Sequence, residues 1–357
     1  MAAPFSLLIV GGGCSGALLA SLLPPALQAT TQLWEKSTSA GRFATSTARG
    51  AAAGARADGG AQYCTAFDAP SAAALEAAAA AGALRRLPPG AILGEREPTA
   101  SLPSYYAPAG ARSLVEHYLR AAAGGGVALH KSRRLVALEA GVPGAAGAAG
   151  AAAGAAAAAA ASAAPAATPA AEPPAAPQPQ LQWLATDEAG GEAWFSAVVL
   201  TLPVPQLLEL RGGALAGALA ASGLRAALAS VAYSSRFALT LHLARGSLGS
   251  LAERLPWHAR YVAPAQQGGD VLRYLAFEDR KRWGEGGGGG ASGGGGGGGE
   301  GGEGAPCPTF TAHSSVELGA AHEKATPERW TTRRAWQWAT AGQTCTARSR
   351  CGPSGTG

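Results

Sequence analysis

The sequence predicts an α/β fold in which a parallel sheet, built from alternating strands and helices, is followed by a set of antiparallel strands. Three observations predict it. An apolar run at 5–10 leads into a glycine-rich turn, and a helix-like run at 17–23 follows that turn. A second apolar strand ends at 33–36. After residue 230 the chain reads as successive strands without helices between them, which is typical of an antiparallel sheet.

The turn between the first strand and the first helix has the pattern G-x-G-x-x-G, from Gly11 to Gly16. Gly11 permits the tight turn, Gly13 lets the backbone approach a pyrophosphate, and Gly16 lets helix and strand pack closely. The start of the helix offers free N–H groups and a positive dipole end to phosphates. Glu35 follows about 20 residues after the glycines, where an acidic residue binds a ribose hydroxyl.

An alternative interpretation of the same residues is a glycine-rich loop with a surface glutamate. The chain has 52 glycines, so the pattern also recurs by chance. The order of strand, turn, helix and second strand favours a dinucleotide site.

The remaining elements follow in order. Residues 71–87 read as a helix and 104–110 as a turn, and 111–123 form an amphipathic helix with an apolar face of Leu114, Val115, Tyr118 and Leu119. Residues 197–202 are apolar throughout, as in a strand buried on both faces. The pattern of 206–229 is helical, and further strands are predicted at 127–139, 181–186, 192–202, 231–243, 255–263, 271–278 and 310–316.

Two stretches are too poor in apolar side chains to pack. Residues 140–180 are almost wholly Ala, Gly and Pro, and residues 284–304 are almost wholly Gly. Neither stretch buries enough surface to offset the entropy of ordering, so both are predicted to be disordered insertions in loops.

Charge and cysteine usage narrow the class of protein. The net charge is +5, and the segment 329–357 alone holds five arginines and no acid, so the basic balance is poor evidence for a nucleic-acid surface. The five cysteines (Cys14, Cys64, Cys307, Cys345 and Cys351) show neither metal spacing nor a paired framework, which fits a reducing compartment. The apolar stretch 7–27 is interrupted by glycines and prolines and does not suit a membrane span. With no targeting segment recognised, we expect a cytoplasmic protein.

Several motifs together resemble one family. They are the segments 8–16, 34–36, 41–42 and 57–63, and then 200–205, 232–239, 255–257, 272–274 and 279–282. In order and spacing they resemble the renalases, small FAD-dependent members of the flavin amine-oxidase group. The resemblance implies a Rossmann-like, p-hydroxybenzoate-hydroxylase-like FAD domain with an inserted antiparallel-sheet substrate domain. It also implies oxidation of isomeric or misreduced NAD(P)H through FAD, with O₂ as acceptor, giving NAD(P)⁺ and hydrogen peroxide.

The resemblance also implies a division of the chain. The FAD-binding domain would comprise 1–66, 106–139 and 181–205, and the substrate domain 67–105 and 206–330. The segments 140–180 and 284–305 would be disordered, and 331–357 an irregular tail.

Carried onto this sequence, the resemblance assigns the cofactor site. Gly11, Gly13, Ser15 and Gly16 would hold the pyrophosphate, Glu35 the adenosine ribose, and Arg42 the phosphates. The flavin ring would be lined by Gly60, Ala61, Gln62 and Tyr63. The alternatives are a solvated loop arginine for Arg42 and ordinary strand packing for Gln62 and Tyr63.

Candidates for the substrate side are aromatic and arginine side chains, which can sandwich a nicotinamide and contact phosphates. They are Tyr233, Arg236, Trp257, Arg273 and Tyr274, and structural roles on the strands are the alternative. His242 and His313 are expected to be structural. No metal site and no protein acid or base is predicted, because hydride transfer to a flavin can proceed without one. The expected partners are a small-molecule substrate and O₂, with neither nucleic acid nor membrane.

The sequence departs from the family pattern in two places. Arg133 takes the place of a small apolar residue expected next to the adenine. The strand, Gly-Asp turn and helix that would close the flavin pocket are not recognisable after residue 330, which suggests a truncated or frame-shifted gene model with weakened FAD binding. Two alternatives therefore stay open: an amine oxidase acting on small amines, and a degenerate nucleotide-binding protein without catalysis.

Overall fold

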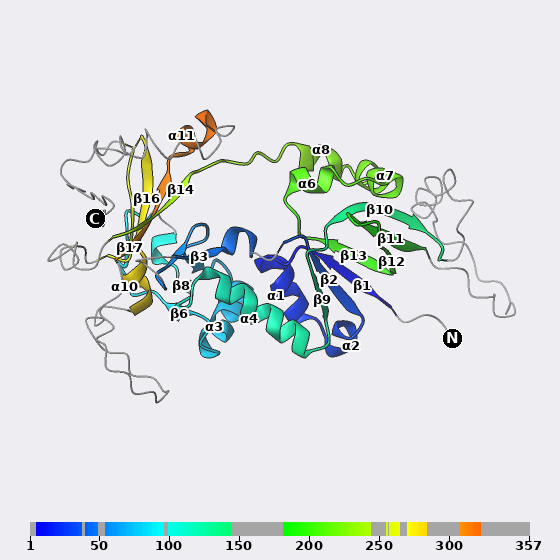
Figure 1. The fold of residues 1–357 in the computed structure, drawn as a ribbon, viewed down its shortest axis with the longest axis horizontal. Coiled ribbons are helices and arrows are strands. Elements are labelled where there is room, and N and C mark those ends of the chain that lie inside the picture. The colour runs from blue at the N-terminus through cyan, green and yellow to red at the C-terminus, as the bar shows by residue number, and fades with distance from the viewer. Residues whose placement is uncertain are drawn as a thin grey trace, which may run out of the picture. The chain divides into compact units, whose positions relative to one another are not determined.

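The computed structural model divides the chain into two compact units (Figure 1). The first unit comprises Met1–Ser46, Asp58–Leu87 and Pro103–Ala232, and the second comprises Thr47–Ala57, Pro88–Leu102 and Tyr233–Gly357. The structure describes residues 5–37, 40–48, 54–95, 99–143, 181–243, 255, 257–264, 270–283 and 308–322. The segment predicted to be disordered at 140–180 begins too early, because strand β10 (Leu135–Gly141) includes its first two residues. The rest of it from residue 144, the segment 284–305, the tail 331–357 and the last three cysteines lie outside the described residues.

A four-stranded parallel sheet forms the centre of the first unit. Its order is β13-β1-β2-β9, and all three neighbouring pairs are parallel. The strands are β1 (Leu7–Val10), β2 (Thr31–Glu35), β9 (Ala128–Lys131) and β13 (Ala197–Leu200). The helix α1 (Cys14–Leu22) follows β1 directly. The predicted α/β fold with a parallel sheet is therefore confirmed.

Alternate side chains of β1 face two different cores, as the period of two in a strand requires. Leu7 and Ile9 pack in one core with Ala20 of α1 and Ala122 of α4 (Ala111–Gly124). Leu8 and Val10 pack in the other core, which also contains Trp34 and Phe195. The apolar run of β1 is thus explained, because both faces of this central strand are buried.

The second of these cores lies beneath an antiparallel sheet of β10 (Leu135–Gly141), β11 (Gln182–Asp187) and β12 (Glu192–Phe195). The single strand predicted at 192–202 was wrong, because the chain changes sheets at Ser196, whose N–H donates to the Ser6 carbonyl at 2.9 Å. β13 is also half-buried rather than buried on both faces, since it is an edge strand of the parallel sheet.

Four other predictions for the first unit are corrected. The single strand predicted at 127–139 is two strands, β9 and β10, which belong to different sheets. The helix predicted at 71–87 is shorter, since the chain turns at Gly82 with φ +76°. Residues 104–106 form a strand between β5 and β6, not a turn. The helical region 206–229 is three helices, separated at Gly212 (φ +136°) and Gly223 (φ +70°). The elements are α2 (Pro25–Gln28), η1 (Gly41–Phe43), β5 (Cys64–Thr65), α3 (Ala69–Ala80), β6 (Arg85–Arg86), β8 (Ser104–Tyr106), α6 (Val204–Leu208), α7 (Gly213–Ala221) and α8 (Leu224–Ala229). A further pair of short strands is β3 (Thr45–Thr47) and β4 (Arg56–Asp58).

The second unit is built on a five-stranded sheet of order β14-β17-β16-β15-β7. All pairs are antiparallel except β15 with β7. The strand predicted at 231–243 begins only at Ala238, because β17 supplies pairing partners from that residue onward. The elements are β7 (Ile92–Leu93), η3 (Thr99–Ser101), β14 (Ala238–His242), β15 (Ala259–Tyr261), β16 (Leu272–Phe277), α10 (Glu278–Trp283), β17 (Thr309–Ser314) and α11 (Val316–Ala321). Among the helices of the described residues, none combines the length and apolar character needed to cross a membrane.

Arg133 joins the parallel sheet to the antiparallel one. Its guanidinium carbon lies 3.6 Å from the centre of the Trp34 ring, and its Nε donates to Asp187 at 2.8 Å. The other carboxylate oxygen of Asp187 accepts from the N–H of Gly191 at 2.7 Å. The Gly191 N–H is the largest cause of a lowered pKa at Asp187, and Arg133 lowers it further. The carboxylate is therefore held ionised at the turn between β11 and β12.

We predict that Asp187→Asn destabilises the protein at neutral pH but not in acid. A carboxyl whose folded pKa lies below its ordinary 3.8 contributes stability above that value and loses it as the pH falls through the folded pKa. The urea midpoint of the variant should be below that of the wild type at neutral pH, and the two should converge below pH 3.8. Glu188→Gln is the control, because the Glu188 side chain makes an exposed 3.7 Å pair with Arg134, which contributes little to stability. A difference that persists unchanged in acid would contradict the prediction.

Candidate dinucleotide site

The glycine turn after β1 is fixed by contacts that leave no room for side chains at two of its positions. Gly11 has φ +110°, and a Cβ there would lie 2.5 Å from Oγ1 of Thr201. A Cβ on Gly16 would collide with the carbonyl oxygen of Gly11. At Gly13, by contrast, a Cβ would meet nothing within 4 Å. The turn is thus tight on the side of the sheet and open above Gly13, where α1 begins.

The Glu35 carboxylate points at this turn from the end of β2. One oxygen accepts from the N–H of Gly12 at 2.7 Å. The other accepts from the N–H and from the hydroxyl of Ser37, both at 2.8 Å. The structure therefore brings the predicted ribose-binding acid and the predicted phosphate-binding turn into direct contact.

A slot lies between α4 and the carboxyl ends of the parallel strands. The empty space along it, open solvent included, is about 440 Å³. Apolar side chains from α4, β2 and β9 face it together with polar ones from the strand ends. Its lining is Gly12, Leu33, Glu35, Ser37, Ala40, Arg112, Val115, Glu116, Leu119, Leu129, His130 and Lys131. Ligands of open α/β sheets bind at this edge.

The lining of the slot includes residues that the sequence motifs do not predict. Arg112, Val115, Glu116 and Leu119 recur at the spacing of one helix face, so a single face of α4 lines the slot. The sequence pattern predicts the apolar part of this helix face, but it does not predict Arg112 as a ligand-facing residue. No local pattern indicates that a helix face packs against the end of a distant strand. His130 and Lys131 were missed for the same reason. Burial first, and then the charge of Arg133, lowers the pKa of His130, so its ring is neutral at neutral pH.

Arg133 itself does not line the slot, although it was expected next to the adenine. Its guanidinium is engaged by Trp34 and Asp187, and its backbone N–H donates to the Glu35 carbonyl at 2.9 Å. The strand end that meets the slot is therefore two to three residues earlier, at His130 and Lys131.

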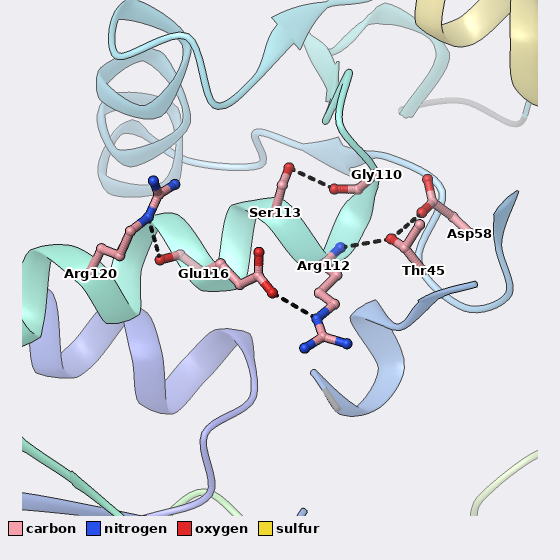
Figure 2. Close-up of polar contacts among 7 residues, drawn as sticks. All are labelled: Thr45, Asp58, Gly110, Arg112, Ser113, Glu116 and Arg120. Carbon is pink, nitrogen blue, oxygen red and sulfur yellow. Dashed lines mark hydrogen bonds and ion pairs between the residues drawn. The ribbon is translucent and has the colours of Figure 1, made fainter. Parts of the chain in front are cut away.

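The start of α4 is fixed by a buried carboxylate (Figure 2). Asp58, which is 1% exposed, accepts from the hydroxyl of Thr45 at 2.6 Å and from the N–H of Ala111 at 2.8 Å. The hydroxyl of Thr45 in turn accepts from the N–H of Arg112 at 3.0 Å. Two N–H groups of the first helical turn are therefore satisfied, which sets the position of the slot-lining face.

The segment expected to line the flavin packs on the backbone of Arg42. A Cβ on Gly60 would collide with the Arg42 carbonyl oxygen, and the N–H of Ala61 donates to the same oxygen at 2.8 Å. The amide of Gln62 is buried and donates to the Asp58 carbonyl. Tyr63 is half-buried. The side chain of Arg42 is exposed, and Arg42 is not among the residues that line the slot.

Cys14 and Cys64 lie near these two segments but do not suit nucleophilic chemistry. Burial raises the pKa of Cys14 to about 11, and burial together with the neighbouring Cys14 raises that of Cys64 to about 12. Both thiols are therefore protonated at neutral pH. They pack against the core that contains Leu114 and Tyr118.

The candidates for the substrate side all belong to the second unit, where they form separate groups. Trp257 is 6% exposed and packs in the core with Phe277 and Phe310, whose rings are stacked at 4.6 Å. Tyr274 is 4% exposed, and its ring lies between those of Tyr261 and His313, at 5.0 and 5.3 Å.

The two arginines and the remaining tyrosine are more open. Arg236 and Arg273 both act on Glu317, whose pKa is lowered mainly by its own backbone N–H and then by Ser315 and the two arginines. Arg236 donates to the Ser314 carbonyl at 3.4 Å, and Arg273 donates to the Val262 carbonyl at 3.5 Å. Tyr233 is 53% exposed. Both arginines thus act on Glu317, and Tyr274 lies with two other rings.

Comparison with known proteins shows local similarity in sequence and wider similarity in fold. The chain is 32% identical to mouse (Mus musculus) renalase over 101 residues, which are 28% of this chain and 27% of that protein. It therefore spans about a quarter of the length of this relative. No protein-family model matches the sequence.

Two solved structures are similar in fold at low sequence identity. One is a Pyrococcus furiosus protein, with a TM-score of 0.51, 11% identity, and coverage of 91% of this chain and 84% of that one. The other is a putrescine oxidase redesigned in its cofactor binding, with a TM-score of 0.50, 9% identity, and coverage of 91% and 78%. The mixed α/β fold of this chain is the fold of these proteins.

We predict that alanine destabilises the protein at one glycine of the turn but not at another. Gly16→Ala should lower the free energy of unfolding by about 1–3 kcal/mol, because the new Cβ meets backbone that cannot move away. Gly13→Ala should change it by less than about 0.5 kcal/mol, since φ is −73° and the Cβ enters open space. Urea unfolding of both variants measures the difference. Equal stability of the two variants would contradict the turn geometry.

Proposed function

We propose that the protein is an FAD-dependent oxidoreductase related to renalase. The observation that carries the proposal is the contact of the Glu35 carboxylate with Gly12 at the rim of the slot. A carboxylate in this position accepts from ribose hydroxyls, and the open N-terminal end of α1 accepts phosphates. The local similarity to mouse renalase supports a flavin cofactor over a nicotinamide cofactor in this site.

The residues present fit such a cofactor. The space above Gly13 is open, as a pyrophosphate requires, and it would be shared with Gly11, Ser15 and Gly16. The slot offers Leu33, Val115, Leu119 and Leu129 as apolar walls for a purine. We propose that Gly60, Ala61, Gln62 and Tyr63 line the flavin ring and that Arg42 reaches the phosphates. When bound, the flavin would take a hydride from a reduced nicotinamide and pass the two electrons to O₂, giving H₂O₂.

The proposed substrate is an isomeric or misreduced NAD(P)H, which leaves as NAD(P)⁺. Arg236 and Arg273, which both help to lower the pKa of Glu317, support this choice, because guanidinium groups suit the phosphates of a dinucleotide better than the ammonium group of an amine. Tyr233, Trp257 and Tyr274 are the proposed aromatic residues of the substrate side. The chain's residues would bind and orient the nicotinamide and exclude water, without a protein acid or base.

A second candidate is oxidation of small amines. The fold likeness to putrescine oxidase is compatible with it, although this likeness concerns the fold alone. A nucleotide-binding protein without catalysis is the third. The three are separated by one set of spectra.

We predict that the purified protein, reconstituted with FAD, shows flavin absorbance at about 375 and 450 nm, the bands of the cofactor itself. The bands should bleach without oxygen on addition of reduced nicotinamide isomers, and H₂O₂ should appear stoichiometrically when air is admitted. Putrescine and other amines, added in parallel, should leave the bands unchanged. Bleaching by amines alone would favour the amine oxidase, and a protein that cannot be loaded with FAD would refute all flavin chemistry.

We predict that Glu35→Gln weakens FAD binding about tenfold or more, the usual cost of losing a hydrogen bond to a charged group. The amide keeps the size of the side chain but loses the charge that accepts from ribose hydroxyls. Fluorescence titration of the apoprotein with FAD measures the change. Glu76→Gln, an exposed glutamate on α3, is the matched control. An unchanged dissociation constant for Glu35→Gln would show that the carboxylate does not contact the ribose.

A further inference from the structure

Arg112 is a cationic residue of the slot to which neither the sequence motifs nor the comparisons give a role. It is the second residue of α4 and lines the slot together with Gly12, the central residue of the glycine turn. Its side chain is 39% exposed, so the guanidinium is partly withdrawn from water at the slot wall.

We propose that Arg112 is a phosphate-binding residue of this slot: its guanidinium supplies the positive charge that the phosphates of a bound adenine dinucleotide require. The proposal deepens the proposed function and rests on it, because that function places an adenine dinucleotide in the slot. The ligand chemistry is that of an adenosine diphosphate group, which is shared by FAD and NAD.

The first support is the way in which Arg112 is held. Its backbone N–H donates to Thr45, which donates to the buried Asp58, so the start of the side chain is fixed (Figure 2). Its Nε donates to Glu116 at 2.7 Å, one helical turn further along the same slot-lining face. A guanidinium anchored at both ends is pre-organised, so less conformational freedom is lost when an anion binds.

The second support is the charge around the glycine turn. The first turn of α1 carries no acidic side chain, and the last turn no basic one, so the helix itself offers only N–H groups and its dipole. Arg42, the arginine expected at the phosphates, is exposed and does not line the slot. Lys131, the other cation of the lining, is paired in register with Glu35 on the neighbouring strand. Arg112 is thus the cation that α4 contributes to the described slot lining, across from the strand ends that carry Glu35 and Lys131.

The same helix provides a matched control. Arg120 lies two turns beyond Arg112, and its Nε donates to the backbone carbonyl of the same Glu116 at 3.2 Å. It is exposed at the helix surface and is not among the residues that line the slot (Figure 2). Removing either arginine deletes one positive charge and one contact to Glu116 from α4, but only Arg112→Ala changes the slot.

The experiment measures binding of ADP and of adenosine to the wild type and to three variants by calorimetry. We expect the wild type to prefer ADP, and Arg112→Ala to lose about tenfold or more in affinity for ADP while it binds adenosine as before. Unchanged adenosine binding also shows that the slot is folded. Arg112→Lys should recover only part of the loss, because a point charge lacks the two-pronged geometry of a guanidinium. Arg120→Ala should behave as the wild type.

Four results would overturn the proposal: no preference for ADP in the wild type, an unchanged preference in Arg112→Ala, an equal loss in Arg120→Ala, or a loss of adenosine binding equal to the loss of ADP binding. Should Arg112→Ala fold poorly, Arg112→Gln tests the same idea, because it keeps a hydrogen-bond donor of similar length beside Glu116 but removes the positive charge, and it should cost ADP affinity while adenosine binding stays as in the wild type. Failure of the proposed function is a separate outcome: the wild type would show the Arg112-dependent preference for ADP but would bind no FAD.

Discussion

The site depends on the close approach of the first helix to the end of the parallel sheet. At Gly16 the helix backbone touches the carbonyl of Gly11, at a distance that excludes even a methyl group. Thr201, which follows β13, donates to the carbonyls of Val10 and Gly11 at 2.9 and 3.1 Å. The turn is therefore held from two directions, by its own helix and by the next strand. This approach brings the open N–H groups of α1 to the edge where β2 ends.

The position of Glu35 follows from the same constraint. The N–H of Gly11 donates to the Trp34 carbonyl at 2.8 Å, which continues the pairing of β1 with β2 into the turn. Glu35 is the next residue of β2, so its side chain lies beside the turn, and its carboxylate accepts from the N–H of Gly12. Ser37 then supplies two further donors, so the orientation of the carboxylate is set before any ligand binds. Pre-organisation of this kind lowers the entropy lost on binding.

The sequence predicts the features that depend on nearby residues, and it does not predict those that depend on contacts between distant parts of the chain. The turn from Gly11 to Gly16, the placement of Glu35 and the helix at 111–123 are encoded by spacing within about 25 residues, and the structure contains each. The break at Ser196 is set by β1, which pairs with the residues after it from the other end of the described chain, and no periodicity marks it. The start of β14 at Ala238 depends in the same way on β17. Arg112 belongs to this second class, because only the packing of α4 across the strand ends gives it a ligand-facing position.

Asp58 shows how two distant parts of the candidate site are coupled. Its carboxylate fixes Thr45 and the start of α4, and so the face that carries Arg112 into the slot. Its carbonyl accepts from the Gln62 amide, within the segment proposed to line the flavin. A buried carboxylate with several donors cannot move without leaving some of them unsatisfied, which is costly in a low-dielectric interior. The slot that would hold the adenosine end and the segment proposed to line the flavin are thus both bonded to Asp58, the first through its carboxylate and the second through its backbone carbonyl.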